Sequence, residues 1–249
     1  MRGAPVVFIA AMRAELGPVL EALRRPATSR RGGQTFLTGE LDGRPALLTW
    51  TGVGARAADA GARCALERVV ELGWTDARLF AVGVAGGLSP SAKLGEVFAF
   101  HTCRRFDAGD RETGRLELTV PSGGIPRAEL LTLDRVVAEP AAKTELWRRL
   151  GEPAAAAVDM ETYYVAARLA ASGRDVLAVR AISDGPADGL PAWLAACAGP
   201  DGGLSQTRVA MGVLARPRSA PALLDLRRRV ALASERLCAT LRELIEGGR

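Results

Sequence analysis

The sequence predicts an α/β fold whose mostly parallel or mixed sheet is covered by helices on both faces. Short apolar runs without period-2 alternation recur along the chain, and such runs are typical of strands buried on both faces. Segments with apolar residues at helical spacing separate these runs, and this alternation is characteristic of α/β proteins. The chain has 249 residues, so we expect residues 1–249 to form a single domain.

The individual elements follow from these two patterns and from the turn residues between them. The predicted strands cover residues 5–11, 35–38, 44–51, 78–84, 96–103, 130–137 and 175–182. The second and third strands flank a turn that contains Asp42 and Gly43, which predicts a hairpin. The predicted helices cover residues 13–25, 57–72, 140–150, 161–172 and 220–246.

The composition indicates a globular, soluble and cytoplasmic protein. Apolar residues make up 48% of the chain, but no run reaches the roughly 18 apolar residues of a membrane span. The N-terminal run lacks a signal-peptide cleavage site, and the four separated cysteines favour reduced thiols. The net charge of +5 favours an anionic partner such as a membrane surface. Nucleic acid is not favoured, because aromatic and basic residues are not interleaved.

Most catalytic systems that use histidine, a metal or a nucleotide cofactor lack their residues in this chain. His101 is its one histidine, and no residue near it in the sequence suggests a nucleophile or a zinc site. The glycine runs at residues 52–54 and 83–87 match neither a P-loop nor a complete dinucleotide fingerprint. We therefore expect a mechanism without metal or cofactor that depends on carboxylates.

Three acidic residues stand where predicted strands end. Glu15 follows the first strand, Glu161 opens a helix, and Asp184 follows the last strand. Ligands of α/β proteins bind at the carboxyl ends of strands. Burial would raise the pKa of these carboxyl groups, which suits proton transfer near neutral pH. One such acid alone could simply stabilise a helix start, but three together favour a catalytic site.

Five motifs, in the same order, resemble those of the nucleoside phosphorylase/nucleosidase superfamily. They are IAAMRAE at residues 9–15, TGVG at 51–54, GVAGGL at 83–88, VDME at 158–161 and RAISD at 180–184. Methylthioadenosine/adenosylhomocysteine nucleosidases are one branch of this superfamily. The resemblance covers about residues 5–188 and implies a three-layer αβα sandwich with a twisted mixed central sheet. It also implies cleavage of the N-glycosidic bond of a purine nucleoside, with release of adenine.

The resemblance implies a role for each acid. Asp184 corresponds to the acid that binds or protonates purine N7, Glu161 to the carboxylate that binds the ribose hydroxyls, and Glu15 to the base that activates water. Protonation makes the purine a better leaving group, and negative charge near the sugar favours the positive charge that develops there. The other expected substrate-binding residues are Val84, Ala85, Gly86, Val136, Val137, Met160 and Ser183.

Water is the predicted acceptor of the ribosyl group. In the phosphorylases that the chain resembles, an arginine before the first glycine of the GVAGG motif and a hydroxyl residue after it hold phosphate. Ala81 and Val84 occupy these places, and neither side chain can donate a hydrogen bond to a dianion. Arg13, Arg56 or Arg180 could supply a replacement site, so a phosphate-dependent purine nucleoside phosphorylase is an alternative.

The C-terminal part of the chain bears on the substrate. Residues 188–221 are rich in glycine and proline and predict a loop-rich insertion before the helix over residues 220–246. Residues 204–224 resemble hopanoid-associated nucleoside phosphorylase-like proteins, which release adenine from adenosylhopane. This resemblance implies an apolar groove near the ribose 5′ end and a peripheral position at the inner membrane. The alternative substrates are methylthioadenosine, adenosylhomocysteine and futalosine.

Two expectations concern assembly and activity. Members of the superfamily often form oligomers, so the resemblance implies a homodimer. A purine-nucleoside-binding sensor without catalysis is the alternative to an enzyme. The presence of Glu15, Glu161 and Asp184 together favours the enzyme.

Overall fold

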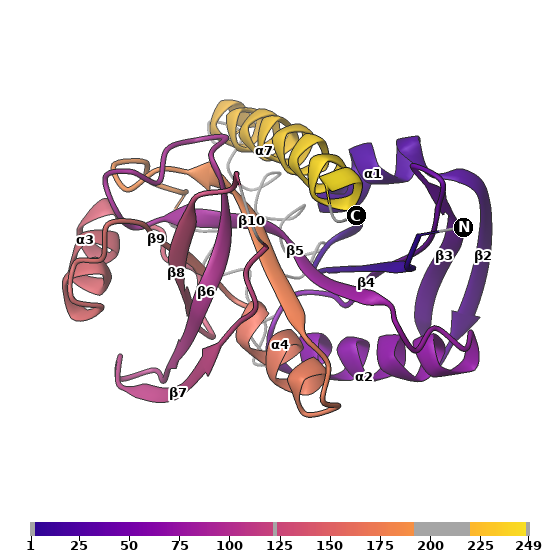
Figure 1. Cartoon of the computed structure of the whole chain (residues 1–249). Coiled ribbons are helices and arrows are strands. Elements are labelled where there is room, and N and C mark those ends of the chain that lie inside the picture. The colour runs from indigo at the N-terminus through magenta and orange to yellow at the C-terminus, as the bar shows by residue number, and fades with distance from the viewer. Residues whose placement is uncertain (1–2, 122–123, 192–219, 248–249) are drawn as a thin grey trace.

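The computed structural model describes residues 3–121, 124–191 and 220–247 of the chain. One mixed sheet of ten strands lies between layers of helices (Figure 1), which confirms the predicted α/β fold with a mixed central sheet. The strands are β1 (Val6–Ala10), β2 (Arg24–Arg31), β3 (Gln34–Leu41), β4 (Arg44–Trp50), β5 (Arg78–Gly87), β6 (Val97–Phe106), β7 (Glu112–Glu117), β8 (Arg127–Thr132), β9 (Ala156–Asp159) and β10 (Val176–Asp184). The helices are the short 3-10 helix η1 (Arg13–Leu16), α1 (Gly17–Ala22), α2 (Ala55–Glu71), α3 (Pro140–Arg149), α4 (Thr162–Ala170) and α7 (Ala220–Gly247).

Three details differ from the elements that the sequence predicts. The helix expected over residues 13–25 ends at Ala22, and the chain continues into β2. Strands β2 and β7 are polar and mostly exposed, so no apolar run marks them in the sequence. The strand expected over residues 130–137 is β8, which ends at Thr132 and is followed by a loop over residues 133–139. Of the insertion predicted over residues 188–221, residues 192–219 lie outside the described part of the chain.

Five strands of the sheet close into a ring. Strand β5 pairs with β9 and β10, β10 pairs with β6, β6 with β8, and β8 with β9. Phe98, Phe100, Leu130 and Ile182 belong to the apolar cluster of these strands. Beyond β5 the sheet continues through β1, β4, β3 and β2. The ring and the open sheet therefore share β5, whose first half pairs with β1 of the open sheet and whose carboxyl end pairs with β9 of the ring.

Alternate residues of β1 face opposite helical layers, which explains why its apolar run is continuous. Phe8 packs in the cluster that contains Leu237 and Leu241 of α7, whereas Ile9 packs in the cluster of α2 and α4. Figure 1 shows α7 on one side of the sheet and α2 on the other. Each large apolar side chain buried in this way contributes about 1.5–3 kcal/mol to stability.

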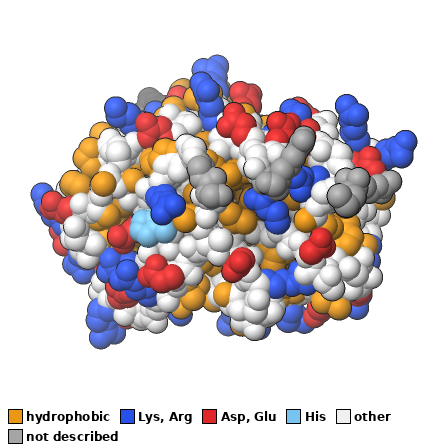
Figure 2. All heavy atoms as spheres, viewed as in Figure 1, with side chains coloured by type: hydrophobic (Ala, Val, Ile, Leu, Met, Phe, Trp, Pro, Cys, Tyr) orange, Lys and Arg blue, Asp and Glu red, His pale blue; other side chains and the backbone are white. Residues whose placement is uncertain are grey.

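The surface does not separate charges of opposite sign on the face seen in Figure 2. Acidic, basic and apolar side chains are interspersed there, so the net charge of +5 is not gathered into one basic stripe on this face. Within the described ranges, no helix combines the length and the apolar character needed to cross a bilayer.

Candidate active site

The ten residues that the sequence predicts for the site all line one cavity of about 150 Å³. They are Glu15, Val84, Ala85, Gly86, Val136, Val137, Met160, Glu161, Ser183 and Asp184. The sequence did not predict the other lining residues, which are Ala11, Met12, Val53, Arg135, Val158, Asp159 and Leu190. Segments that are distant in sequence therefore meet here, and the loop after β8 supplies the valines that the resemblance placed near the base.

Strand direction brings the acids to one edge of the sheet. Strands β1, β5 and β10 are parallel, so their carboxyl ends lie at the same edge, and Glu15 and Asp184 come with them. Strand β9 is antiparallel to β5 and pairs with Gly86 and Gly87. The end of this short strand therefore delivers Asp159 and Glu161 to the cavity.

A β-bulge aims Asp184 at the cavity. Ile182 pairs with Ala85 and Asp184 pairs with Gly86, so Ser183 is the extra residue on β10. The Ser183 hydroxyl donates a hydrogen bond of 2.7 Å to Asp184 Oδ1. A Cβ atom at position 86 would lie only 3.2 Å from Asp184 Oδ2, so glycine there leaves room for the carboxylate at the cavity wall.

Lys143 is a partner of Asp184 that the sequence did not predict. This lysine of α3 is fully buried, and its Nζ donates to Asp184 Oδ2 at 2.5 Å, to Gly185 O at 2.7 Å and to Asp188 O at 3.0 Å. In the sequence, Lys143 shares the apolar face of its helix with Leu146 and lies three residues before it. A lysine on the apolar face of a predicted helix was the feature of the sequence that could have indicated a buried, functional side chain.

Glu15 is bound through both of its carboxylate oxygens. Its Oε2 accepts a hydrogen bond of 2.7 Å from the backbone N–H of Met12, and its Oε1 accepts one of 3.0 Å from the N–H of Val84. Only 2% of the residue is exposed. Burial raises the pKa of Glu15, and the nearby Arg180 guanidinium opposes this in part.

Glu161 stands at the N-terminus of α4 but does not cap it. It occupies the N-cap position, but its side chain makes no capping hydrogen bond, and Asp159 Oδ2 instead accepts one of 3.1 Å from Thr162 N–H. The Glu161 carboxylate instead accepts a hydrogen bond of 2.9 Å from Gly54 N–H in the TGVG motif. Burial, and then the negative charge of Asp159, raise the pKa of Glu161. A helix-start role therefore does not explain where this side chain lies.

Arg180 lies buried next to Glu15 and is committed to protein groups. Its guanidinium donates to Val82 O at 2.7 Å and to Thr162 Oγ1 at 2.6 and 3.0 Å, and it lies 3.1 Å from Asp159 Oδ2. Arg180 is therefore a structural counter-ion. Because its donors are bound to protein groups, the structure does not favour a replacement phosphate site at Arg180. Another candidate for that site, Arg13, lies over the Trp50 ring at 5.9 Å.

We expect Glu161→Gln to raise stability at about pH 8 relative to the native protein. The folded protein binds more protons than the unfolded chain when a carboxyl pKa is raised on folding, so stability falls as pH rises above the ordinary value of 4.5. Glutamine escapes this loss and can still accept the Gly54 hydrogen bond. Urea unfolding at about pH 8 and pH 5 checks this, because the gain should shrink at the lower pH. The exposed Glu21→Gln is the control, and a Glu161→Gln variant that is less stable at both pH values would contradict the prediction.

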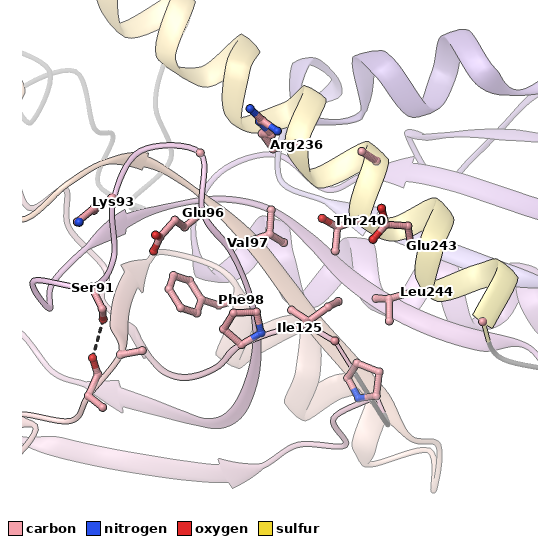
Figure 3. Close-up of a pocket in the computed structure, with 18 of the residues that line it drawn as sticks. Ser91, Lys93, Glu96, Val97, Phe98, Ile125, Arg236, Thr240, Glu243 and Leu244 are labelled. Atoms are coloured by element: carbon pink, nitrogen blue, oxygen red, sulfur yellow. Dashed lines mark hydrogen bonds between the residues drawn. The ribbon is translucent and has the colours of Figure 1, made fainter.

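A larger hollow of about 1010 Å³ lies between the start of β6 and the end of α7, and it shares no lining residue with the cavity. Val97, Phe98, Ile125 and Leu244 give it an apolar floor (Figure 3). Its charged lining residues, such as Lys93 and Glu96 in Figure 3, are of both signs. None of the acids predicted for the site lies there.

The remaining candidates for chemistry do not gather at the cavity. His101 lies on β6 and does not line it. Cys64, Cys103 and Cys238 are free thiols, and Cys197 lies outside the described residues. In the part of the chain that the structure describes, no three His, Cys, Asp or Glu side chains could together hold a metal ion.

Comparison of the sequence with known proteins gives a family match and a match to one relative. A family model described as "Phosphorylase superfamily" matches residues 5–123 and 125–196. A 5′-methylthioadenosine/S-adenosylhomocysteine nucleosidase of Pseudoalteromonas translucida (strain TAC 125) is 30% identical over 102 residues, which is 41% of this chain and 41% of that relative. The sequence match thus spans about two fifths of the relative's length.

Solved structures resemble the fold over nearly the whole chain. An S-adenosylhomocysteine nucleosidase of Streptococcus pyogenes matches with a TM-score of 0.73 and 17% identity, covering 100% of this chain and 99% of that chain. A futalosine hydrolase of Helicobacter pylori strain 26695 matches with a TM-score of 0.69 and 15% identity, covering 98% of each chain. At these identities the likeness concerns the fold.

Proposed function

The chain belongs to the phosphorylase superfamily, and from this membership we propose that it cleaves the N-glycosidic bond of an adenine nucleoside by hydrolysis. One observation carries the proposal. Glu15, Glu161 and Asp184 are all at least nine-tenths buried, and they line one cavity from three different parts of the fold. Each acid is held by separate partners, so each can perform a separate task.

The roles follow from what surrounds each acid. Asp184, on the bulge of β10, binds the base and passes a proton to purine N7. Glu161 accepts hydrogen bonds from the ribose hydroxyls, and in its ionised form it stabilises the positive charge that develops on the sugar. Glu15 takes a proton from the attacking water, a role that its raised pKa suits because the carboxylate then binds a proton more readily than an ordinary glutamate does.

Water suits this cavity better than phosphate as the acceptor. Ala81 is fully buried, and the backbone N–H of Val84 is already used by Glu15. The Arg180 guanidinium is bound to Val82, Thr162 and Asp159. A phosphate dianion would therefore meet the Glu15 carboxylate without a free cation among these groups to offset its charge.

We expect base release to continue undiminished in buffer that contains no phosphate. Added phosphate should neither raise the rate nor change the sugar product, because hydrolysis yields the free sugar rather than its 1-phosphate. Turnover with and without phosphate, with both products quantified, checks this. Strict dependence on phosphate, or sugar 1-phosphate as the main product, would show that the acceptor is not water.

For the specific substrate we propose adenosylhopane. The cavity volume of about 150 Å³ is below the roughly 300 Å³ at the lower end of small-molecule sites. A large 5′ substituent would therefore extend beyond it. At the start of α7 the side chain of Leu224 is 54% exposed, and Arg227 and Arg228 beside it are exposed as well. An apolar residue next to arginines suits a lipid-linked substrate and contact with an anionic membrane.

The substrate proposal predicts a ranking of kcat/KM values. Adenosylhopane should be cleaved more efficiently than methylthioadenosine, adenosylhomocysteine or futalosine when all four are assayed with the same preparation. The measurement is base release in detergent micelles, with micelles included in every assay so that conditions match. Equal or better turnover of methylthioadenosine would remove adenosylhopane as the favoured substrate and leave the hydrolysis proposal intact.

A further inference from the structure

We propose that Lys143 is a positioning residue that keeps, beside Asp184, the proton that the departing purine takes up. This proposal rests on the proposed function. The chain has only two lysines among its 33 Lys and Arg residues, Lys93 and Lys143. Lys93 is exposed, whereas Lys143 is fully buried against the acid assigned to the base. An arginine cannot be deprotonated in a protein, but a lysine can.

The hydrogen bonds of Lys143 place its charge and its proton. All three donors of an ammonium group have acceptors here, which are Asp184 Oδ2, Gly185 O and Asp188 O. Asp184 Oδ2 also lies at the cavity wall, as its closeness to Gly86 shows. One oxygen atom therefore touches Lys143 on its inner side and can touch a purine on its outer side.

The charges of Lys143 and Asp184 determine which of the two groups holds the transferable proton. Protonating Asp184 while Lys143 stays charged would leave a buried ammonium without its counter-ion, which is costly. The favoured state is therefore a carboxylate paired with an ammonium, and the transferable proton resides on Nζ. Asp184 in this state has no proton of its own to give to a base.

The transfer balances with the groups present. As the C1′–N9 bond breaks, its electron pair stays on the purine, and one proton moves from Lys143 Nζ to Asp184 Oδ2 and on to N7. The water oxygen bonds to C1′ and gives a proton to Glu15. Lys143 is then neutral and Glu15 protonated, and proton exchange with solvent restores both. The products are neutral purine and free sugar.

Other charged groups lie around Lys143 and Asp184, and substituting Lys143 does not replace any of them. Asp188 and its partner Arg229 of α7, which lie 3.0 Å apart, close one side. The charged groups around the cavity are Glu15, Arg135, Asp159, Glu161 and Arg180. A change in pH dependence on substituting Lys143 therefore reports Lys143 itself.

The test compares Lys143→Arg and Lys143→Gln with the native protein. The assay is base release from whichever of adenosylhopane and methylthioadenosine the native protein cleaves faster. Lys143→Arg keeps the charge and the donors but holds its protons, so kcat should fall about 10²-fold or more while KM changes less than about threefold. Lys143→Gln should move the alkaline limb of the kcat profile to lower pH, because a lone carboxyl group loses its proton at lower pH than an amine.

The outcomes separate this role from a purely structural one. Lys93→Arg and Lys93→Gln are the matched controls, and thermal melting confirms folding of each variant. If Lys143→Arg does not fold, the position of the alkaline limb in the kcat profile of Lys143→Gln alone tests the role of Lys143. A folded Lys143→Arg variant with kcat within about threefold of native, or an unmoved limb in Lys143→Gln, would overturn the role of Lys143 while base release by the native protein upholds the proposed function. Absence of base release by the native protein would overturn both.

Discussion

Replacing Asp184 by asparagine is expected to lower kcat for base release by about 10²–10⁴-fold, with KM changed only a few-fold. The amide is nearly the same size as the carboxylate, and its oxygen can still accept a hydrogen bond from Ser183 or Lys143. It cannot relay a proton from Lys143 to purine N7, so the loss should appear in the chemical step. Steady-state kinetics of base release, with nucleoside affinity measured separately by calorimetry, checks the split.

The control for this variant must separate chemistry from folding. Asp184→Asn removes the carboxylate from a fully buried ion pair, and breaking such a pair costs about 3–5 kcal/mol. Kinetics should therefore be measured well below the melting temperature of the variant. Asp76→Asn, on an exposed loop before β5, should leave both kcat and stability unchanged. If the native protein binds nucleoside tightly but releases no base, the chain is a sensor and not an enzyme.

Replacing Gly83 by alanine should lower the stability of the fold by an amount on the order of 3 kcal/mol. A Cβ atom at this position would lie 2.0 Å from Arg180 Nη1 and 2.6 Å from Glu15 Oε1, and the glycine has a φ of +152°. Arg180 cannot move away cheaply, because Val82, Thr162 and Asp159 all hold its guanidinium. Displacement of Glu15 should also lower kcat. Urea unfolding and base release measure the two effects.

Gly17→Ala is the matched control for that variant. Gly17 begins α1 with a helical φ of −45°, and no atom lies within 4 Å of where its Cβ would stand. The same substitution should there be neutral or stabilise by about 0.4–1 kcal/mol, because alanine restricts the unfolded chain more than glycine does. Similar unfolding curves for Gly83→Ala and the native protein would show that the Arg180–Glu15 contact is looser than its geometry indicates.

The fold was predictable for those elements whose burial requires a recognisable apolar pattern in the sequence. Strands β1, β5 and β10 are buried on both faces and appear as continuous apolar runs. Strand β2 reads RRPATSRR, and it is held by pairing with β3 rather than by burial. Its local sequence is compatible with several conformations, and the partner strand decides between them. The closure of β5, β9, β8, β6 and β10 into a ring likewise depends on pairings between distant segments.

The candidate site was predictable one residue at a time but not as a network. The resemblance of the motifs pointed to ten of the residues that line the cavity, and the carboxyl ends of parallel strands lie at one edge of the sheet. The pairing of Lys143 with Asp184 joins residues 41 positions apart, and no local pattern encodes it. The same holds for Asp159, whose carboxylate accepts the hydrogen bond of Thr162 N–H at the start of α4, while the Glu161 carboxylate accepts that of Gly54 N–H. Both are effects of packing between helices and strands.

The nine residues of β10 are all buried, and the strand is hydrogen-bonded to β5 on one side and β6 on the other. Amides in such a strand exchange with deuterium only when the whole protein unfolds. Asp184 and Ser183 therefore belong to the slowest-exchanging part of the chain. Their side chains are preorganised before a ligand binds. Local opening is instead expected at the loops that hold Ala138 and Leu190, which are joined by a backbone hydrogen bond of 2.8 Å. A bound ligand should therefore change the rate of amide hydrogen exchange at Leu190 but not the exchange rates of the amides in β10.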